Sequence, residues 1–401
     1  MRYVRSLHNP ARSMLYTLRR TSIRGSTRSS TLVPEDWRPC ERRQHNRSGQ
    51  VRPPSTCSGL GSQSRRNYTT NFVNVFRTPT AGMRSPMANA TAGCSNRGFF
   101  TFFSGDNATQ TDLGGRTPVE PGEVSLPRTV PDHIPKTPYY AAGVVPQPDD
   151  KIHVHTPETL APMREACTLA RDMLDLCCEM AQPGITTDEI DSAVHAAIVE
   201  AGACPSPLNY HGFPKSVCSS VNEVACHAIP DSRPLQDGDI VSFDVSVFHK
   251  GFHGDNCATV GVGAVDDAAH RLMDAAKEGM MAGVSVCRPG ACMTEIGYAI
   301  HAVADRYGYD TVRKYCGHGV GSSFHMLPFV EHFRNSRKLE MVAGMTFTVE
   351  PIFTEGSEAT STWSDGWTVQ TVDGGRAAQF EHVVLITEDG HEILTVPSQT
   401  P

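Results

Sequence analysis

Apolar residues begin to recur at helical spacing shortly after Thr156. Thr156-Pro157-Glu158 has the pattern of an N-cap followed by proline at the first helical position. Residues that would share one helix face then follow at Leu160, Met163, Cys167, Ala170, Leu174 and Cys178. Pro183-Gly184 stops this pattern, so an amphipathic helix is predicted between the two signals.

A second helix follows directly, and its pattern returns later in the chain. Thr186 and Glu189 form a capping-box pattern for a helix that runs to Gly202. At an offset of 106 residues, Pro183-Gly184, Glu189-Ile190, Ala193, His195-Ala196 and Gly202 match Pro289-Gly290, Glu295-Ile296, Ala299, His301-Ala302 and Gly308. Two copies are too few for a solenoid, which needs about three or more repeats.

The same offset carries Gly238 onto Gly344 and Asp244 onto Glu350. These residues bound two short, Gly-led runs, GDIVSFD and GMTFTVE, and each run predicts a strand that ends in a carboxylate. We therefore expect two αβ halves that share one sheet with approximate two-fold symmetry, with one carboxylate from each half near the axis. Both acids could be ordinary strand-end residues, but an acid on an apolar strand is costly to bury unless it is paired or bound to metal.

Further candidate ligands accompany these strands. Asp255 follows Asp244 after a predicted hairpin turn at His249-Lys250-Gly251, so the two acids are expected on adjacent antiparallel strands. His318 stands between glycines, which indicates close approach of the backbone to a bound group.

Glu350 and Glu381 raise the set to four carboxylates and one histidine. Four carboxylates in one pocket would repel one another strongly unless cations lie between them. Two divalent ions about 3.5–4 Å apart, bridged by two of the carboxylates, would remove that repulsion.

Composition excludes several classes of protein. The formal net charge is −7 and no apolar run is long enough to span a bilayer, so neither a direct nucleic-acid partner nor a membrane is expected. The 13 cysteines are irregularly spaced in a long chain and include no C-x-x-C. This argues against a disulfide scaffold or a zinc ribbon and favours free thiols in a reducing compartment.

The first 150 residues differ from the rest. Residues 1–34 carry seven Arg and no acid, so the remainder carries −14 when the whole chain carries −7. With no apolar h-region, this composition predicts an organelle transit peptide, for the mitochondrion or alternatively a plastid; a merely disordered basic tail would leave the protein in the cytoplasm. Residues 35–150 are expected to be irregular and of low complexity, at least until they dock on a catalytic domain at 151–401.

From about Thr156 to Thr395 the chain resembles the type I methionine aminopeptidases. The motifs that carry the resemblance are Asn209-Tyr210-His211-Gly212-Phe213-Pro214-Lys215-Ser216, Val224-Ala225-Cys226-His227-Ala228-Ile229-Pro230-Asp231, Gly254-Asp255, Gly317-His318-Gly319, Phe324-His325, Thr348-Val349-Glu350-Pro351 and Ala378-Gln379-Phe380-Glu381-His382. Only about 25 residues separate His325 from Glu350, where the type II enzymes carry a large insertion. The resemblance implies the α+β "pita-bread" fold, with two pseudo-symmetric αβ halves around a dinuclear metal site.

The resemblance also implies roles for individual residues. The metal ligands would be Asp244, Asp255, His318, Glu350 and Glu381, with Asp255 and Glu381 as the bridging pair. The two divalent ions could be Co, Zn, Mn or Fe(II). The catalytic residues would be His227, His325 and Glu350, with both histidines contacting substrate and not metal. The pocket for the methionine side chain would include Tyr210, Phe213, Cys218, Phe324 and Trp367.

The implied activity is that of a metallo-exopeptidase, a hydrolase that removes the N-terminal methionine of nascent proteins. The second residue would have to be small (Gly, Ala, Ser, Cys, Thr, Pro or Val), because His227 and the bulky Met326 are expected to crowd it at the mouth of the site. The enzyme would work near the ribosome, as a monomer.

The chain departs from the family pattern at three places. Ala228 stands for the usual Gly, Ser246 for the usual Thr near the metals, and Met326-Leu327 for more polar residues at the mouth. Two alternatives to methionine removal are considered. A proline-directed aminopeptidase or dipeptidase of this fold would have a folded, sizeable N-terminal domain, and a non-enzymatic binding protein of this fold would have lost metal ligands.

Overall fold

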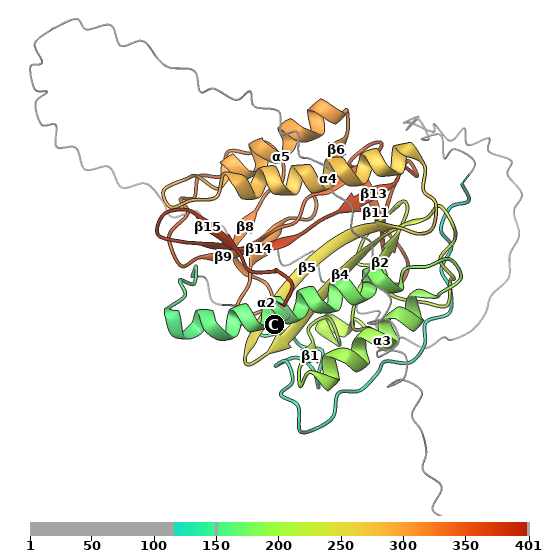
Figure 1. Ribbon diagram of the computed structural model, residues 1–401, viewed down its shortest axis with the longest axis horizontal. Coiled ribbons are helices and arrows are strands. Elements are labelled where there is room, and N and C mark those ends of the chain that lie inside the picture. Colours follow the sequence, from blue (N-terminus) through green and yellow to red (C-terminus); the bar gives the residue numbers. More distant parts are fainter. Residues whose placement is uncertain (1–115, 149–150, 399–401) are drawn as a thin grey trace, which may run out of the picture. The chain divides into compact units, whose positions relative to one another are not determined.

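The computed structural model describes residues 116–148 and 151–398, which form an α+β fold (Figure 1). The helices are α2 (Pro157–Met180), α3 (Thr187–Glu200), α4 (Asp267–Ser285) and α5 (Thr294–Tyr307), with a short 3-10 turn η1 (Tyr210–Gly212). The strands are β1 (Cys204–Pro205), β2 (Cys218–Val221), β3 (Val224–Cys226), β4 (Ile240–His249), β5 (Phe252–Gly261), β6 (Asp310–Thr311), β7 (Gly317–Gly319), β8 (Met326–Val330), β9 (Thr346–Val349), β10 (Ile352–Thr354), β11 (Thr360–Thr362), β12 (Val369–Thr371), β13 (Ala377–Gln379), β14 (His382–Ile386) and β15 (His391–Ile393). The expected transit peptide (1–34) and much of the expected irregular extension (35–115) lie outside the described residues.

Both helices predicted for the first half form with the predicted starts. α2 begins at Pro157, directly behind its N-cap residue Thr156. At the start of α3, the hydroxyl of Thr186 accepts a hydrogen bond from the Glu189 N–H at 3.1 Å, and the Glu189 carboxylate accepts one from the Thr186 N–H at 2.9 Å. This capping box satisfies N–H groups that a helix start would otherwise leave unpaired, and such caps are worth about 1 kcal/mol.

β4 and β5 form the predicted hairpin. They pair antiparallel along their full lengths. The turn between them is made by Lys250 and Gly251, whose φ angles of 50° and 86° are both positive. A two-residue turn of this kind matches the twist of the strands it joins.

The 106-residue repeat is also a repeat of hydrogen bonds. The N–H of Gly184 donates to the carbonyl of Leu235 at 2.7 Å, and at the equivalent place the N–H of Gly290 donates to the carbonyl of Met341 at 2.9 Å. The turn before α3 is therefore built in the same way as the turn before α5.

The two repeated strands differ in length. Gly238 and Gly344, which lead into them, adopt φ angles of 92° and 90°, a region that a β-carbon disfavours. β9 ends directly before Glu350, as the sequence predicted. β4 instead continues to His249, so Asp244 lies in the middle of a strand and the prediction of a strand-end acid was wrong there.

Each half has its own sheet and its own core. The first-half sheet has the order β1-β4-β2 with β5 paired to β4, and the second-half sheet has the order β15-β14-β9-β7-β8. Two three-stranded sheets, β13-β10-β6 and β11-β12-β3, complete the strand pairing among the described residues. α2 and α3 contribute to one buried apolar cluster and α4 and α5 to another, on opposite sides of the strands (Figure 1).

The expected single shared sheet is therefore not what forms. The two halves are joined instead by the pairing of β3 with β12 and by an isolated antiparallel bridge between Cys257, on β5, and Glu381, just before β14. Ten cysteines lie in the described part of the chain, and all ten are unpaired thiols, as predicted. Within the same residues, no helix combines the length and the apolar character needed to cross a membrane.

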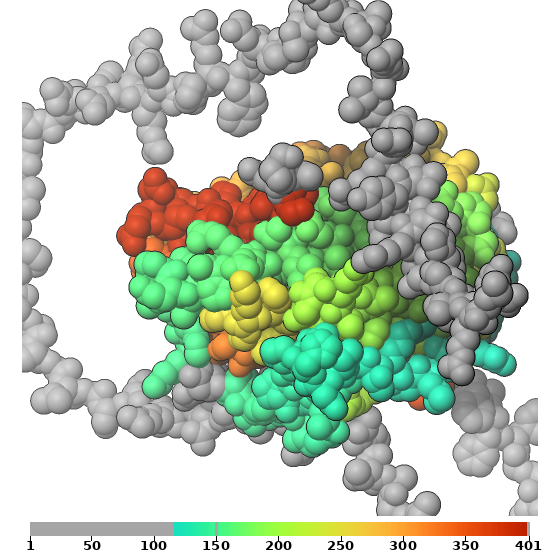
Figure 2. All heavy atoms as spheres, turned by 60° about the horizontal axis from the view of Figure 1, so that its bottom comes forward, coloured from blue at the N-terminus to red at the C-terminus, as the bar shows by residue number. Residues whose placement is uncertain are grey.

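Residues 116–148, called the N-terminal arm below, have no helix or strand, yet they pack closely on the first half. Val130, Ile134 and Tyr139 are each at most 4% exposed. Val130 and Ile134 join Cys204 and Phe248 in one apolar cluster. Figure 2 shows the arm in cyan along the surface of the green first half.

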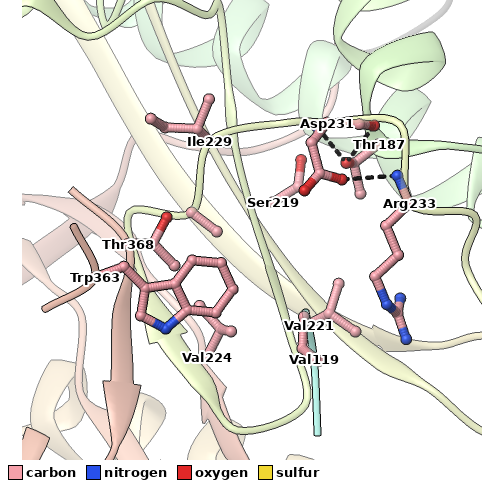
Figure 3. A pocket seen from close by; sticks show the side chains of 11 residues that line it. Val119, Thr187, Ser219, Val221, Val224, Ile229, Asp231, Arg233, Trp363 and Thr368 are labelled. Atoms are coloured by element: carbon pink, nitrogen blue, oxygen red, sulfur yellow. Dashed lines mark hydrogen bonds between the residues drawn. The ribbon is translucent and has the colours of Figure 1, made fainter. Parts of the chain in front are cut away.

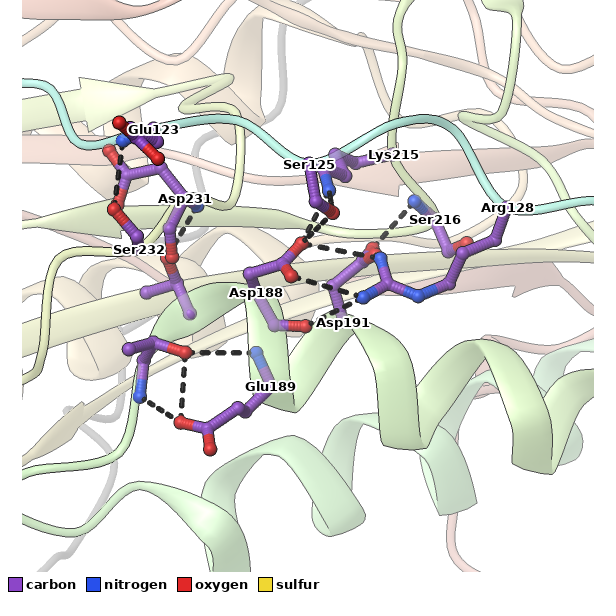
Figure 4. A network of polar contacts seen from close by, with 12 residues as sticks. Glu123, Ser125, Arg128, Asp188, Glu189, Asp191, Lys215, Ser216, Asp231 and Ser232 are labelled. Carbon is purple, nitrogen blue, oxygen red and sulfur yellow. Dashed lines mark hydrogen bonds and ion pairs between the residues drawn. The ribbon is translucent and has the colours of Figure 1, made fainter.

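Ion pairs fasten the arm to α3, and a hydrogen bond from Lys215 to the Ser125 hydroxyl ties it to the segment before β2 (Figure 4). The guanidinium of Arg128 pairs with the carboxylates of both Asp188 and Asp191. Asp188 also pairs with Lys215, whose side chain is fully buried, and accepts a hydrogen bond from the Ser125 hydroxyl at 2.8 Å. The network thus connects two arm residues with three residues of the remaining described chain, residues 151–398, called the body below.

The network predicts a pH-dependent contribution of Asp188 to stability. Burial raises the pKa of Asp188, but hydrogen bonds from Lys215, Arg128 and Ser125 lower it by more. The net result is a pKa of about 2, below the usual 3.8. A carboxylate whose pKa is depressed in the folded state stabilises the fold above its unfolded pKa and loses that effect as the pH falls through its folded pKa. Asp188→Asn should therefore reduce the free energy of unfolding at pH 7 by roughly 1–2 kcal/mol, after allowance for partial exposure. The difference from wild type should shrink between pH 4 and pH 2 in urea titrations.

Asp132→Asn is the matched control, because Asp132 is a fully exposed arm carboxylate that pairs with Lys136. It should leave the unfolding free energy unchanged. If Asp188→Asn reduces the free energy of unfolding by the same amount at pH 2 as at pH 7, the negative charge of Asp188 does not have the assigned role.

Candidate metal and substrate site

A cavity of about 610 Å³ is lined by residues of both halves and of the N-terminal arm. All twelve site residues predicted from the sequence lie in its wall: Tyr210, Phe213, Cys218, His227, Asp244, Asp255, His318, Phe324, His325, Glu350, Trp367 and Glu381. The structure thus brings together residues that are spread over more than 170 positions of the chain.

The first two acids lie on adjacent strands of the β4–β5 hairpin. Asp244 is opposite Cys257 and Asp255 is opposite Ser246, so the two acids are diagonal neighbours on one face. The Ser246 hydroxyl donates a hydrogen bond to Asp255 Oδ1 at 2.7 Å. Ser246 therefore supplies the hydroxyl that the sequence comparison led us to expect beside the acids.

β7 and β9 bring His318 and Glu350 to the same place. His318 Nδ1 lies 3.1 Å from the carbonyl of Gly319 and can donate to it, which leaves Nε2 for the acids. Nε2 is 3.6 Å from Asp255 Oδ2 and 3.5 Å from Glu350 Oε1. The Thr348 hydroxyl accepts from the N–H of His318 at 2.9 Å and donates to Glu350 Oε1 at 2.7 Å, so it orients both residues.

Glu381 lies at the junction of the two halves. Its N–H donates to the carbonyl of Cys257 at 2.9 Å, within the isolated bridge described above. Potential ligand atoms of Asp255, His318 and Glu381 all lie within 4.8 Å of one another, and all three residues are buried.

The electrostatics of this group call for cations. Burial raises the pKa of Asp244 to about 7. It raises the pKa of Asp255, Glu350 and Glu381 well above the usual range, and neighbouring carboxylates add to the effect. Burial also lowers the pKa of His318 to about 4, so its imidazole is neutral at pH 7. Carboxylate oxygens with one imidazole are a donor set that fits divalent metal ions, which would allow the acids to ionise together.

The two glycines beside His318 serve strand packing. A β-carbon on Gly317 would lie 2.3 Å from the carbonyl oxygen of Thr348, and one on Gly319 would lie 2.2 Å from that of Leu327. β7 is therefore held tightly between β8 and β9, with which it pairs. The sequence interpretation, that these glycines allow approach to a bound group, was wrong, because the close approach is to the protein's own backbone.

His227 and His325 line the same cavity but, like Asp244 and Glu350, are not among the three residues whose ligand atoms converge within 4.8 Å. The ring of His325 is 4.1 Å from that of His318, and its Nδ1 is buried with no hydrogen-bond partner among the described residues. His227 has a φ of 57° and meets Tyr315 edge to face at 5.0 Å. Burial lowers the pKa of both, that of His227 to about 4, so both rings are neutral at pH 7.

Aromatic rings form the apolar side of the cavity. Tyr210 meets Phe324 edge to face at 5.1 Å, and Phe213 meets Trp367 in the same way at 5.1 Å. Cys218 lies on β2, which pairs with β4, the strand that carries the first acid. Tyr210, Phe213, Phe324 and Trp367, called the aromatic box below, therefore lie in the same cavity as the acids.

Several wall residues were missed from the sequence: Gly143–Pro148, Pro207, His211, Lys314, Tyr315, Cys316 and Phe329. Lys314, Tyr315 and Cys316 directly precede Gly317-His318, a signal that could have identified them. The arm residues had no such signal, because their sequence shows no periodicity.

The expectation that Met326 crowds the mouth of the cavity was wrong. Its side chain is 3% exposed, lies close to Gly321 and does not line the cavity. Burial alternates along β8, and Phe329 is the residue of that strand that reaches the cavity. Because successive strand residues point to opposite faces, Met326 is turned away from it.

A second, much smaller cavity is lined by Val119, Ser219, Trp363 and neighbouring residues (Figure 3). Its volume of about 20 Å³ leaves room for one water molecule. The buried hydroxyl of Ser219 has no hydrogen-bond partner within the described residues, so such a water would have a polar contact there. Of these two cavities, the one of 610 Å³ is large enough for a substrate side chain.

Comparison with known proteins identifies close relatives. The sequence model of metallopeptidase family M24 matches residues 161–388. The chain is similar to methionine aminopeptidase 1D, chloroplastic/mitochondrial, of Arabidopsis thaliana, with 44% identity over 86% of this chain and 98% of the relative. It is also similar to methionine aminopeptidase 1D, mitochondrial, of Homo sapiens, with 46% identity over 69% of this chain and 83% of the relative. Among solved structures, methionine aminopeptidase from Rickettsia prowazekii matches with 43% identity and a TM-score of 0.60, over 61% of this chain and 100% of that chain.

These matches differ in how much of this chain they cover. The match to the human relative covers 277 residues, more than lie between positions 151 and 401, so it includes residues before 151. The match to the bacterial structure covers 61% of the chain, which is about the length of the body from 151 to 398 alone.

The geometry predicts different metal contents for two histidine variants. His318 belongs to the group of converging ligand atoms and its neighbour His325 does not. After removal of metal with a chelator and reloading with Mn²⁺, His318→Ala should retain less metal than wild type by elemental analysis, and His325→Ala should retain as much. Loss of metal in His325→Ala would make that residue a ligand. Wild-type content in His318→Ala would remove His318 from the ligand set.

Proposed function

The chain belongs to metallopeptidase family M24, as a type I methionine aminopeptidase, and we propose that it acts on nascent proteins whose second residue is small, with the assistance of two divalent metal ions. The observation that carries the proposal is the convergence of Asp255, His318 and Glu381 in a cavity that also contains an aromatic box. A metal site and an apolar side-chain pocket in one cavity are the two components that such an exopeptidase needs.

The two ions would be held by the five predicted ligands: Asp244, Asp255, His318, Glu350 and Glu381. Asp255 and Glu381 are the proposed bridging pair. When bound, the ions would polarise the scissile carbonyl and lower the pKa of the attacking water. Co, Zn, Mn and Fe(II) all suit this donor set.

Three side chains would carry out the proton transfers and stabilise developing charge. Glu350 is the proposed base that accepts a proton from the attacking water and passes it to the leaving amine. The neutral rings of His325 and His227 would hydrogen-bond the carbonyl oxygen and the amide as charge develops. This role is supported by the position of both rings in the wall of the cavity that holds the acids. A lower kcat with unchanged metal content is therefore expected when either histidine is replaced by alanine.

The aromatic box is the proposed pocket for the first side chain. Its wall combines Tyr210, Phe213, Phe324 and Trp367 with the thiol of Cys218. Such a polarizable, apolar surface suits an unbranched thioether. A first residue as small as Ala would leave the box empty and lose roughly 2–3 kcal/mol of side-chain burial.

The second substrate residue would lie beside His227. His227 meets Tyr315 edge to face, and both residues line the cavity. Together they narrow the part of the cavity beside His227. Since Met326 does not reach the cavity, His227 and Tyr315 are the residues proposed to exclude a bulky second side chain.

Two other activities were considered from the sequence. Against a non-enzymatic binding protein, all five proposed ligands are present and line one cavity. Against a proline-directed enzyme, the described arm is irregular and has no helix or strand of a folded N-terminal domain. The natural substrates are proposed to be the N-termini of nascent chains near the ribosome, and the enzyme is proposed to act as a monomer.

Hydrolysis of Met-Ala-Ser tests the proposed function. Activity should be lost on chelation and restored by Mn²⁺, and metal-loaded Glu350→Ala should lose most turnover because the proton acceptor is missing. The kcat/KM for Met-Ala-Ser should exceed that for Met-Leu-Ser by at least about tenfold, because a bulky second residue does not fit. Comparable values for the two peptides would contradict the size limit. A preference for Xaa-Pro peptides would favour the proline-directed alternative.

We further propose that the protein acts in the mitochondrion, with a plastid as the alternative. The support is the Arg-rich, acid-free composition of residues 1–34 together with relatives named for these organelles. A fluorescent reporter that carries residues 1–60 should enter an organelle, and the same reporter with the seven arginines of 1–34 replaced by glutamine should not. A wild-type reporter that stays in the cytosol would rule this out.

A further inference from the structure

Part of the N-terminal arm forms a wall of the substrate cavity. Gly143–Pro148 line the same cavity as the acids and the aromatic box. These six residues lie outside the span that the family model matches. The cavity wall is therefore completed by a segment that is separate from the body.

Val145 is the arm residue that packs on the aromatic box. It contacts the apolar cluster formed by Tyr139, Tyr210 and Phe324, on which Trp367 also packs. Val145 is partly buried, whereas its neighbour Val144 is 71% exposed. Because three of these four rings line the cavity, the side chain of Val145 lies at the boundary of the box.

Specific contacts fix this part of the arm. The Tyr139 hydroxyl donates to the carbonyl of Ser206 at 2.7 Å, and its ring meets Tyr210 edge to face at 5.1 Å. The side-chain amide of Asn209 donates to the carbonyl of Tyr140 at 2.7 Å. Since Asn209 directly precedes Tyr210, the arm is bonded to the residue next to the box.

We propose that Val145 is a specificity-determining residue, which with Gly143–Pro148 closes the pocket for the first substrate side chain and limits its length. The inference rests on the proposed function, since it requires the aromatic box to receive that side chain. Removing methyl groups from Val145 lengthens the pocket, and adding one shortens it. In apolar pockets, one methylene group changes discrimination by about 10–200-fold.

The test compares two peptides, Met-Ala-Ser and the same peptide with ethionine in first place, which is one methylene longer. The full chain is reloaded with Mn²⁺ for each measurement. Val145→Ala should raise the ratio of kcat/KM for the ethionine peptide to that for the methionine peptide by about fivefold, less than in a fully enclosed pocket because Val145 is only partly buried. Val145→Leu should lower the same ratio.

Leu126→Ala is the matched control, since Leu126 is an apolar arm residue that is 87% exposed and does not line the cavity. Its ratio should equal that of wild type. If neither Val145 variant changes the ratio, or if both change it in the same direction, as displacement of the arm would do, the wall assignment is overturned. If wild type does not hydrolyse Met-Ala-Ser at all, the proposed function fails and this inference fails with it.

Discussion

The structure depends on the burial of four carboxylates around one histidine. Burial raises the pKa of each acid, and at Asp255, Glu350 and Glu381 the neighbouring negative charges raise it further. Such groups stay ionised together only when cations lie between them, so the protein has to hold its oxygens in fixed positions for those cations. Buried hydrogen bonds supply this order, from a serine hydroxyl to Asp255 and from a threonine hydroxyl to Glu350. The amide of Gln379 adds a contact to the Glu350 carbonyl at 3.2 Å.

The two-fold repeat explains how short elements provide that order. Each half contributes an acid from its repeated strand, Asp244 on β4 and Glu350 directly after β9. The first-half and second-half sheets meet at the bridge between Cys257 and Glu381, so the acid Glu381 lies at the junction itself. The acids therefore lie on strands or directly beside them, and these strands pack against two separate helix-covered cores. Strands position a site more precisely than loops do.

The N-terminal arm shows that ordering a non-periodic segment can complete such a site. Fixing an irregular chain costs conformational entropy, which has to be offset by specific contacts. Here the offset comes from the ion pairs of Arg128 with α3 and from the burial of Tyr139 against the cavity wall. The same contacts that hold the arm on the first half bring Gly143–Pro148 to the cavity.

The sequence alone determined the features that depend on neighbours along the chain. The helix starts at Pro157 and Thr187, the hairpin turn and the two-fold repeat all follow from caps, turn residues and periodicity. The resemblance to the type I methionine aminopeptidases also identified twelve residues that share one cavity. The tertiary structure decided the rest: the separate sheets, the packing role of the glycines beside His318, the burial of Met326 and the contribution of Val145. These features depend on which face of a strand or segment meets which distant partner, and a local pattern does not contain that information.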